Sequence, residues 1–168
     1  MHKLLICTAA LAGLCAQALA APPVYQNGEL SLDHAVVIRA GEGLYYRDLS
    51  FARTTEGTWR LSDATPAQLA VVEEVSVVAE ATLPPLVTVT LEGYKSLPCV
   101  GLEPVGISQQ GKQFHVVLAE TEIPPNVRCI TIIEPFTHSF ELNTRGLEPG
   151  EYQVIANGVT TEFTLPAP

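Results

Sequence analysis

The sequence predicts an all-β protein in which a small N-terminal β unit precedes a β-sandwich. The 13 prolines and most of the glycines separate short runs that are rich in β-branched and aromatic residues. That spacing is typical of strands and turns rather than of helices. Several runs also alternate apolar and polar residues, as half-buried strands do. We therefore expect residues 21–65 to form the small β unit and residues 66–168 to form the sandwich.

The first 20 residues read as a signal peptide. Lys3 gives a basic start, Leu4 to Cys15 is apolar and uncharged, and Ala18-Leu19-Ala20 has the A-x-A form of a cleavage site. Ala16-Gln17-Ala18 is a weaker second site. The apolar stretch is shorter than the roughly 20 residues that a membrane span needs. We expect a bacterial protein that is periplasmic or extracellular, cut after Ala20, with no membrane span in the mature chain.

The charge balance excludes some partners. Lys3 leaves with the signal peptide, so eight of the nine basic residues remain against 18 acidic ones, a net charge of −10. Contacts with phosphate groups depend on Lys and Arg. We therefore expect no binding to nucleic acid or to anionic membrane surfaces.

Two cysteines stay in the mature chain. Cys7 and Cys15 leave with the signal peptide, and Cys99 and Cys129 remain. In an oxidising compartment a lone pair of this kind predicts one disulfide. The chain-entropy model assigns the loop that it closes about 3.7 kcal/mol of stabilisation. A zinc site would need more thiolates or nearby histidines.

The N-terminal unit is expected to hold three strands and a short helix start. An Asn27-Gly28 turn precedes a strand over 29–37, and further strands are expected over 44–51 and 58–61. Thr65 could then cap a helix, with Pro66 at its first position and Gln68 completing a capping box.

Two later segments leave room for alternatives. Residues 71–82 fit a helical stripe and also one face of a strand; the many valines favour a strand, because β-branched side chains suit a pleated surface. Alternation around residues 114–119 places His115 opposite Phe114 and Val116. We therefore expect His115 to face solvent.

The last two strands have the clearest pattern. Asn157-Gly158 predicts a type I′ hairpin turn, because both positions then need positive φ. On turn chemistry alone, Asp would also be tolerated at position 157. A two-residue loop implies three pairs, all with large residues on one face: Ala156 with Val159, Val154 with Thr161, and Tyr152 with Phe163.

The segment from Leu147 to Val154 resembles the corner before the penultimate strand of fibronectin type III and immunoglobulin-like sandwiches. In those domains a Tyr near the strand start bonds back across the corner. Tyr152 would take that role, with Leu147 packing beneath it and Gly150 in the turn. More broadly, residues 71–168 resemble an immunoglobulin-like domain at the C-terminus of many uncharacterised secreted bacterial proteins. The motifs that carry this resemblance are Gly93, Pro98-Cys99, Gly111, Phe114, Cys129, Pro135-Phe136, Gly146-Leu147, Gly150, Tyr152, Asn157-Gly158 and Phe163.

The resemblance implies an immunoglobulin-like antiparallel β-sandwich and says nothing about activity. The chain departs from antibody-type domains because no Trp lies beside the cysteines and neither cysteine follows the corner Tyr by two residues. The bridge is therefore expected to tie the loop at Pro98 to a strand at Ile130.

Catalytic chemistry has no motif in the sequence. The mature histidines, His34, His115 and His138, lie in separate segments without metal-ligand spacing, and there is no G-x-S-x-G and no Gly-rich phosphate loop. We predict no catalytic residues, no cofactor and no metal. Tyr45, Tyr46 and Trp59 belong to the densest aromatic group and are the candidate contact surface.

The expected function is that of a non-enzymatic binding module. Its partner would be another envelope or extracellular protein, or a glycan. One alternative is a secreted inhibitor of a hydrolase, either a protease or a lysozyme. Its inserting loop would be Glu120–Asn126, stiffened by two prolines and held by Cys129. The second alternative is an enzyme of unknown type.

Overall fold

The computed structural model describes residues 22–167, and every regular element in that range is a β-strand. The signal peptide expected over residues 1–20 lies outside the described residues. The strands are β1 (Val24–Gln26), β2 (Glu29–Arg39), β3 (Glu42–Arg53), β4 (Trp59–Pro66), β5 (Val71–Glu80), β6 (Leu86–Lys95), β7 (Gly106–Gln110), β8 (Gln113–Val117), β9 (Glu134–Leu142), β10 (Gly150–Ala156) and β11 (Val159–Leu165). The all-β prediction is confirmed.

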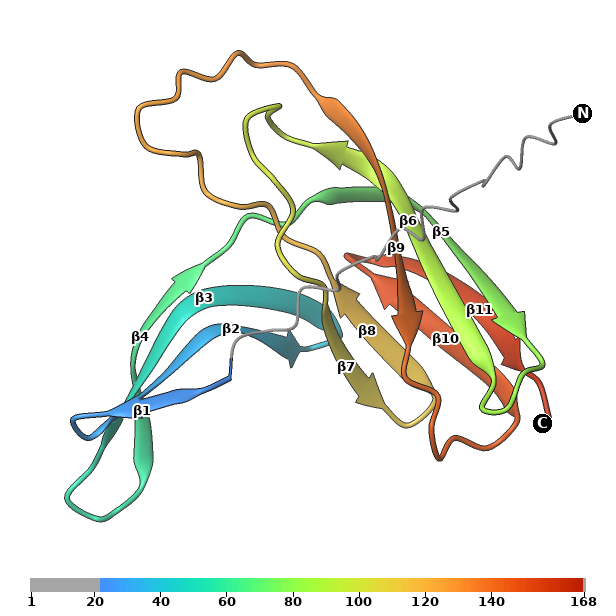
Figure 1. Ribbon diagram of the computed structural model, residues 1–168, viewed down its shortest axis with the longest axis horizontal. Coiled ribbons are helices and arrows are strands. Elements are labelled where there is room, and N and C mark those ends of the chain that lie inside the picture. Colours follow the sequence, from blue (N-terminus) through green and yellow to red (C-terminus); the bar gives the residue numbers. More distant parts are fainter. Residues whose placement is uncertain (1–21, 168) are drawn as a thin grey trace, which may run out of the picture.

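The first four strands form an antiparallel sheet in the order β1-β2-β3-β4, which projects away from the rest of the molecule (Figure 1). The expected strands over 29–37, 44–51 and 58–61 fall within β2, β3 and β4, apart from residue 58, which lies just before β4. The Asn27-Gly28 turn joins β1 to β2, with φ angles of 55° and 84°. Strand β1 was not predicted from the sequence; it is only three residues long.

The predicted helix start at residues 65–68 is wrong. Thr65 and Pro66 are the last residues of β4, where they pair with Arg47 and Tyr46 of β3. The next backbone amide, of Ala67, donates to the carbonyl of Tyr45 at 2.9 Å. A helix cap would stabilise only one turn, whereas the pairing with β3 continues the backbone hydrogen bonds of the β3–β4 pair through Pro66.

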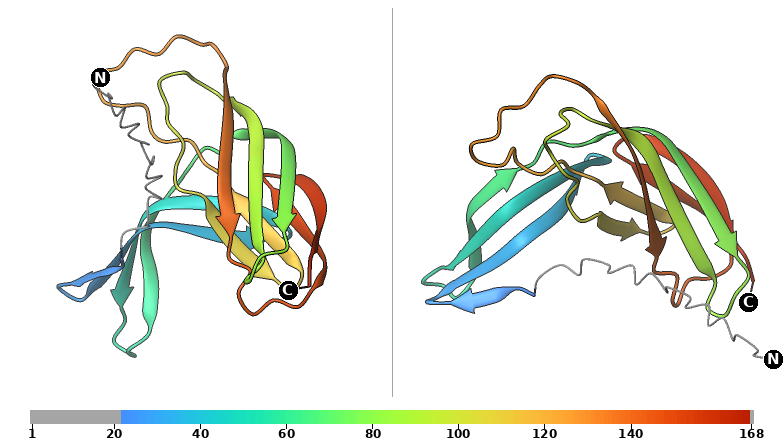
Figure 2. Two further views of the ribbon diagram at one scale, coloured as in Figure 1. Left: turned by 45° about the vertical axis from the view of Figure 1, so that its right-hand side comes forward. Right: turned by 45° about the horizontal axis from the view of Figure 1, so that its top comes forward.

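Residues 71–165 form a β-sandwich whose two sheets have the strand orders β5-β6-β9 and β11-β10-β8-β7 (Figure 2). The valine-rich segment forms β5, so the preference for a strand is confirmed. The core between the sheets contains fully buried residues from both sides, among them Val87, Val89 and Leu91 from β6 and Val154 from β10. Buried positions alternate with more exposed ones along these strands, as the sequence pattern predicted.

One pairing in the sandwich is parallel. β10 pairs with β11 in antiparallel register but with β8 in parallel register, Gln153 lying beside Gln113 and Ala156 beside Val116. β7 then pairs with β8 in antiparallel register at the edge of the sheet. The sandwich is therefore mostly, but not entirely, antiparallel.

One end of the N-terminal sheet packs against β7 and β8, through contacts of β2 with β7 and of β3 with β8. A second, smaller core forms there from Tyr45 of β3 with Val117 and Ala119. Two glycines permit the close approach: a Cβ on Gly43 would overlap Val117, and a Cβ on Gly106 would overlap Val36. The same contact corrects an expectation about His115. This side chain does face away from the sandwich core, but the N-terminal sheet covers it, and it is only 4% exposed.

Candidate functional site

The structure places Tyr45 in the core, so its assignment to the contact surface is wrong. Tyr45 is 2% exposed, its hydroxyl donates to the carbonyl of Pro104 at 3.1 Å, and its ring stacks on His34 with the centroids 5.5 Å apart. Burial, together with the nearby carboxylate of Glu103, raises the pKa of Tyr45 well above its usual range, although Arg47 opposes the shift. Tyr45 holds the N-terminal sheet to the sandwich.

Tyr46 and Trp59 do not join Tyr45 in one surface. Tyr46 follows Tyr45 on β3, so it points to the opposite face, where it is half-buried. Trp59 is 45% exposed at the start of β4 and lies edge-on to Tyr25 of β1, with the ring centroids 5.8 Å apart. Tyr25 is 61% exposed. Tyr25 was not predicted as part of this surface, because β1 was not expected as a strand.

Arg47 connects the N-terminal sheet to two loops of the sandwich. Its Nη1 lies 3.2 Å from Glu103, in the loop before β7, and its Nη2 lies 3.2 Å from Glu122, in the loop before β9. Its Nε atom is buried and has no hydrogen-bond partner among the described residues. The contact with Glu122 helps to fix the start of a long loop between β8 and β9.

That loop, residues 121–133, is the largest irregular segment of the described chain and arches away from the sandwich, drawn in orange in Figure 1. Its beginning is fixed by buried Glu120, whose carboxylate accepts hydrogen bonds from the backbone amide and the hydroxyl of Ser96. Two further bonds join Thr121 to Gly101. The Thr121 amide donates to the Gly101 carbonyl at 3.0 Å, and the Gly101 amide donates to the Thr121 hydroxyl at 2.8 Å.

The disulfide holds the later part of this loop. Cys99 and Cys129 are bonded, with their Cα atoms 5.9 Å apart. The bridge joins the loop before β7 to the 121–133 loop, so the expected partner strand at Ile130 is instead part of a loop. Beyond it, Lys95 pairs with Glu134 at 3.1 Å where β9 begins. The loop is therefore tied to the sandwich at its start, near its far end and at the strand that follows.

The 121–133 loop exposes branched apolar side chains. Five of them are between 46% and 64% exposed: Ile123, Val127, Ile130, Ile132 and Ile133. A turn between them is closed by the Val127 amide, which donates to the carbonyl of Pro124 at 3.2 Å, with Asn126 at a φ of 68°. Exposed apolar groups concentrated on a fixed loop are typical of a surface that binds another molecule.

The corner and hairpin residues have structural roles. The Tyr152 hydroxyl donates to the Glu148 carbonyl at 2.8 Å, and Leu147 packs against the core. Gly150 has a φ of 143°, a conformation that L side chains rarely adopt. The hairpin pairs Tyr152 with Phe163 and turns at Asn157 and Gly158, which have φ angles of 44° and 95°. All of these residues stabilise the sandwich.

The histidines of the described residues lie apart. His34, His115 and His138 lie on β2, β8 and β9, and within residues 22–167 no three His, Cys, Asp or Glu side chains are grouped to hold a metal ion. Burial lowers the pKa of His138. Over the same residues, no helix is long and apolar enough to cross a membrane.

The comparisons with known proteins bear on the fold. Residues 89–165, from β6 to β11, match the family described as the ORF11 beta-sandwich domain. This match agrees with the observed sandwich and supports a β-sandwich domain in this part of the chain. Neither the curated proteins nor the solved structures contain a match to this sequence.

Proposed function

We propose that this protein is a non-enzymatic interaction module that binds another protein through the 121–133 loop. The observation that carries the proposal is the loop itself, in which five branched apolar side chains are exposed while the disulfide and the Glu120–Ser96 bonds hold the backbone. Burying a fully exposed side chain of this size is worth about 1.5 to 3 kcal/mol, and these side chains, 46% to 64% exposed, would gain roughly half of that. A braced loop also loses less conformational entropy when it binds than a free loop would.

The chemistry of the loop favours a protein partner. Its exposed apolar side chains are aliphatic, and they offer neither a flat ring for stacking nor a set of hydrogen-bonding groups for sugar hydroxyls. The loop also carries exposed polar residues, among them Arg128 and Glu122, and a mixture of apolar and polar side chains is typical of protein interfaces. We therefore favour another envelope or extracellular protein over a glycan at this loop.

A second candidate function is inhibition of a hydrolase. The Pro124–Val127 turn, with Asn126 at a positive φ, gives the loop a convex tip between fixed ends. A preorganised loop of that form could enter an active-site cleft. Inhibition assays against a panel of proteases and lysozymes distinguish this function, because an inhibitor would lower the activity of at least one enzyme at stoichiometric concentration.

The proposal also covers the export of the chain and the relation of its sandwich to immunoglobulin-like domains. We infer that the mature chain starts at Ala21 in the periplasm or outside the cell, and the disulfide is compatible with an oxidising compartment. The Tyr152–Glu148 bond supports kinship with immunoglobulin-like and fibronectin type III sandwiches, whereas the parallel β8–β10 pair departs from them. Cell fractionation followed by N-terminal sequencing tests the export.

Site-specific photo-crosslinking tests the loop. A photoreactive residue at Ile132, in the loop, is compared with one at Val78, which is 59% exposed on β5 of the sandwich. We expect a discrete crosslinked partner from Ile132 only, which mass spectrometry would identify. With the purified partner, Ile132→Ser should weaken binding about tenfold, and the matched Val78→Ser variant should bind normally. Equal crosslinking at both positions, or equal affinity of both variants, would contradict the proposal.

A further inference from the structure

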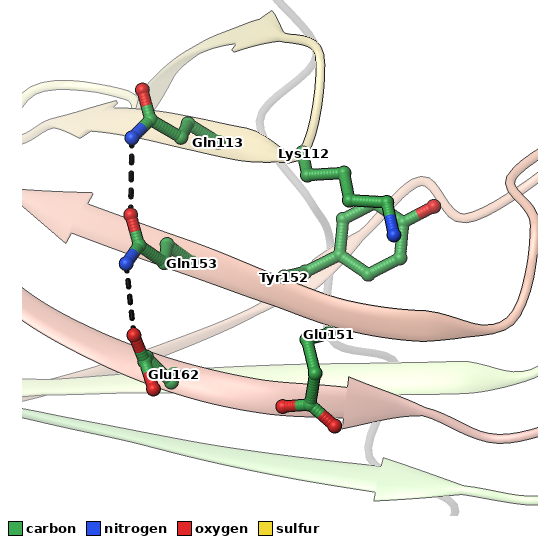
Figure 3. A pocket seen from close by; sticks show the side chains of 6 residues that line it. All are labelled: Lys112, Gln113, Glu151, Tyr152, Gln153 and Glu162. Carbon is green, nitrogen blue, oxygen red and sulfur yellow. Dashed lines mark hydrogen bonds between the residues drawn. The ribbon is translucent and has the colours of Figure 1, made fainter.

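A row of polar side chains crosses the outer face of the β11-β10-β8-β7 sheet. Tyr152, Val154 and Phe163 point into the core, so their neighbours along the strands point outward. Register places Gln113 of β8, Gln153 of β10 and Glu162 of β11 side by side. The Nε2 of Gln113 donates to Gln153 at 3.0 Å, and the Nε2 of Gln153 donates to Glu162 at 2.9 Å (Figure 3).

This polar row keeps both donors and acceptors for a ligand. A side-chain amide has two N–H groups, and each oxygen has two acceptor sites. The two internal bonds therefore leave one N–H on each glutamine, the oxygen of Gln113 and one carboxylate oxygen of Glu162. The row borders a hollow of about 440 Å³ that Lys112, Glu151 and Tyr152 also line. Lys112 forms none of the ion pairs found within residues 22–167.

A second hollow of about 280 Å³ lies two residues further along the same strands. Its sheet side carries His115 and Ile155, which follow Gln113 and Gln153 at the next outward positions. Its other side is formed by Gly41 of the β2–β3 turn and by Gly43 and Leu44 at the start of β3. The imidazole of His115 makes no hydrogen bond with another residue of the described range, although His115 is only 4% exposed. Its ring nitrogens are not among the buried unpartnered atoms of that range, so they keep some access to solvent within a mostly apolar hollow.

Gln113 and His115, which line the two hollows, are about 7 Å apart along β8, since two residues of a strand span roughly that distance. A pyranose ring has similar dimensions, and its hydroxyls both donate and accept hydrogen bonds, as the polar row does. An acetamido group combines a methyl, which suits Leu44 and Ile155, with a carbonyl and an N–H. A neutral imidazole offers one donor and one acceptor to such a group.

We propose that this face binds a neutral saccharide carrying an acetamido group, with the sugar ring over the Gln113–Gln153–Glu162 row and the acetamido group against His115. The net charge of −9 for the full sequence argues against an acidic polysaccharide. This site uses the strands of the sandwich, so it is independent of the 121–133 loop and of the protein partner proposed for it.

A titration followed by NMR tests the site. Uniformly ¹⁵N-labelled protein is titrated with N-acetylglucosamine, its β-1,4-linked disaccharide, glucose, and N-acetylalanine methylamide as a peptide-like amide. We expect saturable shifts of the Gln113 and Gln153 side-chain amides and of the His115 ring with both acetamido sugars. Glucose should bind at least about tenfold more weakly, because it lacks the acetamido group that would hydrogen-bond to the imidazole. The peptide-like amide should leave the two glutamines unchanged.

Variants locate the two contacts. Gln153→Ala should lower the affinity for the disaccharide about tenfold, whereas Gln109→Ala, an exposed glutamine on β7, should leave it unchanged. His115→Gln keeps an N–H donor and should keep the preference for the acetamido sugar over glucose; His115→Phe should abolish it. The amide spectrum of each variant reports whether it folds. Absence of saturable shifts, equal binding of glucose, or shifts of the same residues with the peptide-like amide would overturn the proposal.

Discussion

Replacing Asn157 with Asp tests how strongly the sandwich depends on one turn residue. Asn157 has the positive φ that the type I′ turn needs, and its side chain also bridges two other segments. Its Nδ2 donates to the carbonyls of Ala70 at 2.8 Å and Leu118 at 2.7 Å, and its Oδ1 accepts from the Leu118 amide at 3.1 Å. Asp keeps the shape and the acceptor, but it removes both donors and brings a negative charge to two carbonyl oxygens.

The cost follows from these contacts. Each lost hydrogen bond is worth about 0.5 to 1.5 kcal/mol, and a buried carbonyl left unpaired adds to the loss, so Asn157→Asp should cost about 2 to 4 kcal/mol at pH 7. For a chain of this size that corresponds to a melting temperature lowered by roughly 5 to 15 °C. This predicted cost differs from the expectation based on turn chemistry alone, by which Asp should be tolerated at position 157.

Urea denaturation followed by far-UV circular dichroism measures the effect, with wild type as the reference at each pH. Near pH 4 the carboxyl group introduced by Asn157→Asp becomes protonated; it then regains one O–H donor and loses its charge, so the deficit should shrink. Asn157→Gly is the control, because it keeps the turn angles and removes the same side-chain bonds without adding a charge. A wild-type midpoint for Asn157→Asp at pH 7 would refute the reasoning, and a deficit that does not change with pH would exclude the contribution of the charge.

Three further changes probe the sandwich. Gly93→Ala should cost about 2 kcal/mol or more in chemical denaturation, because its Cβ would overlap the backbone carbonyl of Val71; a small cost would show that β5, whose register with β6 shifts between Val72 and Glu74, moves to make room. Tyr152→Phe should lower the unfolding free energy by about 1 kcal/mol through loss of the bond to Glu148, and an unchanged midpoint would mean that the corner does not need it. Burial lowers the folded pKa of His138, so the unfolded chain gains a proton first; stability is complete above about pH 6.5 and falls as the pH drops through the folded pKa. His138→Gln should therefore lose less stability than wild type between pH 7 and pH 5, and parallel losses would contradict this.

The sequence predicted those parts of the fold in which local and long-range signals agree. In the last hairpin, the turn type at Asn157-Gly158 and the alternation of apolar residues imply one register, and the structure has the pairing of Tyr152 with Phe163. The β2 strand follows its own Asn-Gly turn in the same way. Such segments need little information from the rest of the chain.

The predictions that failed depended on contacts distant in sequence. His115 was expected to face solvent because alternation cannot reveal that a second sheet covers the outer face of β8. Tyr45 and Tyr46 are neighbouring residues of the same type, so the sequence does not show which of them is buried. The packing of the N-terminal sheet buries Tyr45. The prolines predicted an inserting loop over residues 120–126. The exposed isoleucines beyond it belong to the same loop, which is seen only once the disulfide and Glu120 show where the backbone is held.

Arg47 joins two parts of the chain that the sequence presents as separate units. It lies on β3 of the N-terminal sheet, yet its guanidinium contacts Glu122 at the start of the 121–133 loop and Glu103 in the neighbouring connection. Without the guanidinium, the carboxylates of Glu103 and Glu122 would lose the positive charge that they share, and they would repel each other. The start of the loop is therefore in contact with the N-terminal sheet as well as with the sandwich. The binding surface that we propose at this loop thus borders both units.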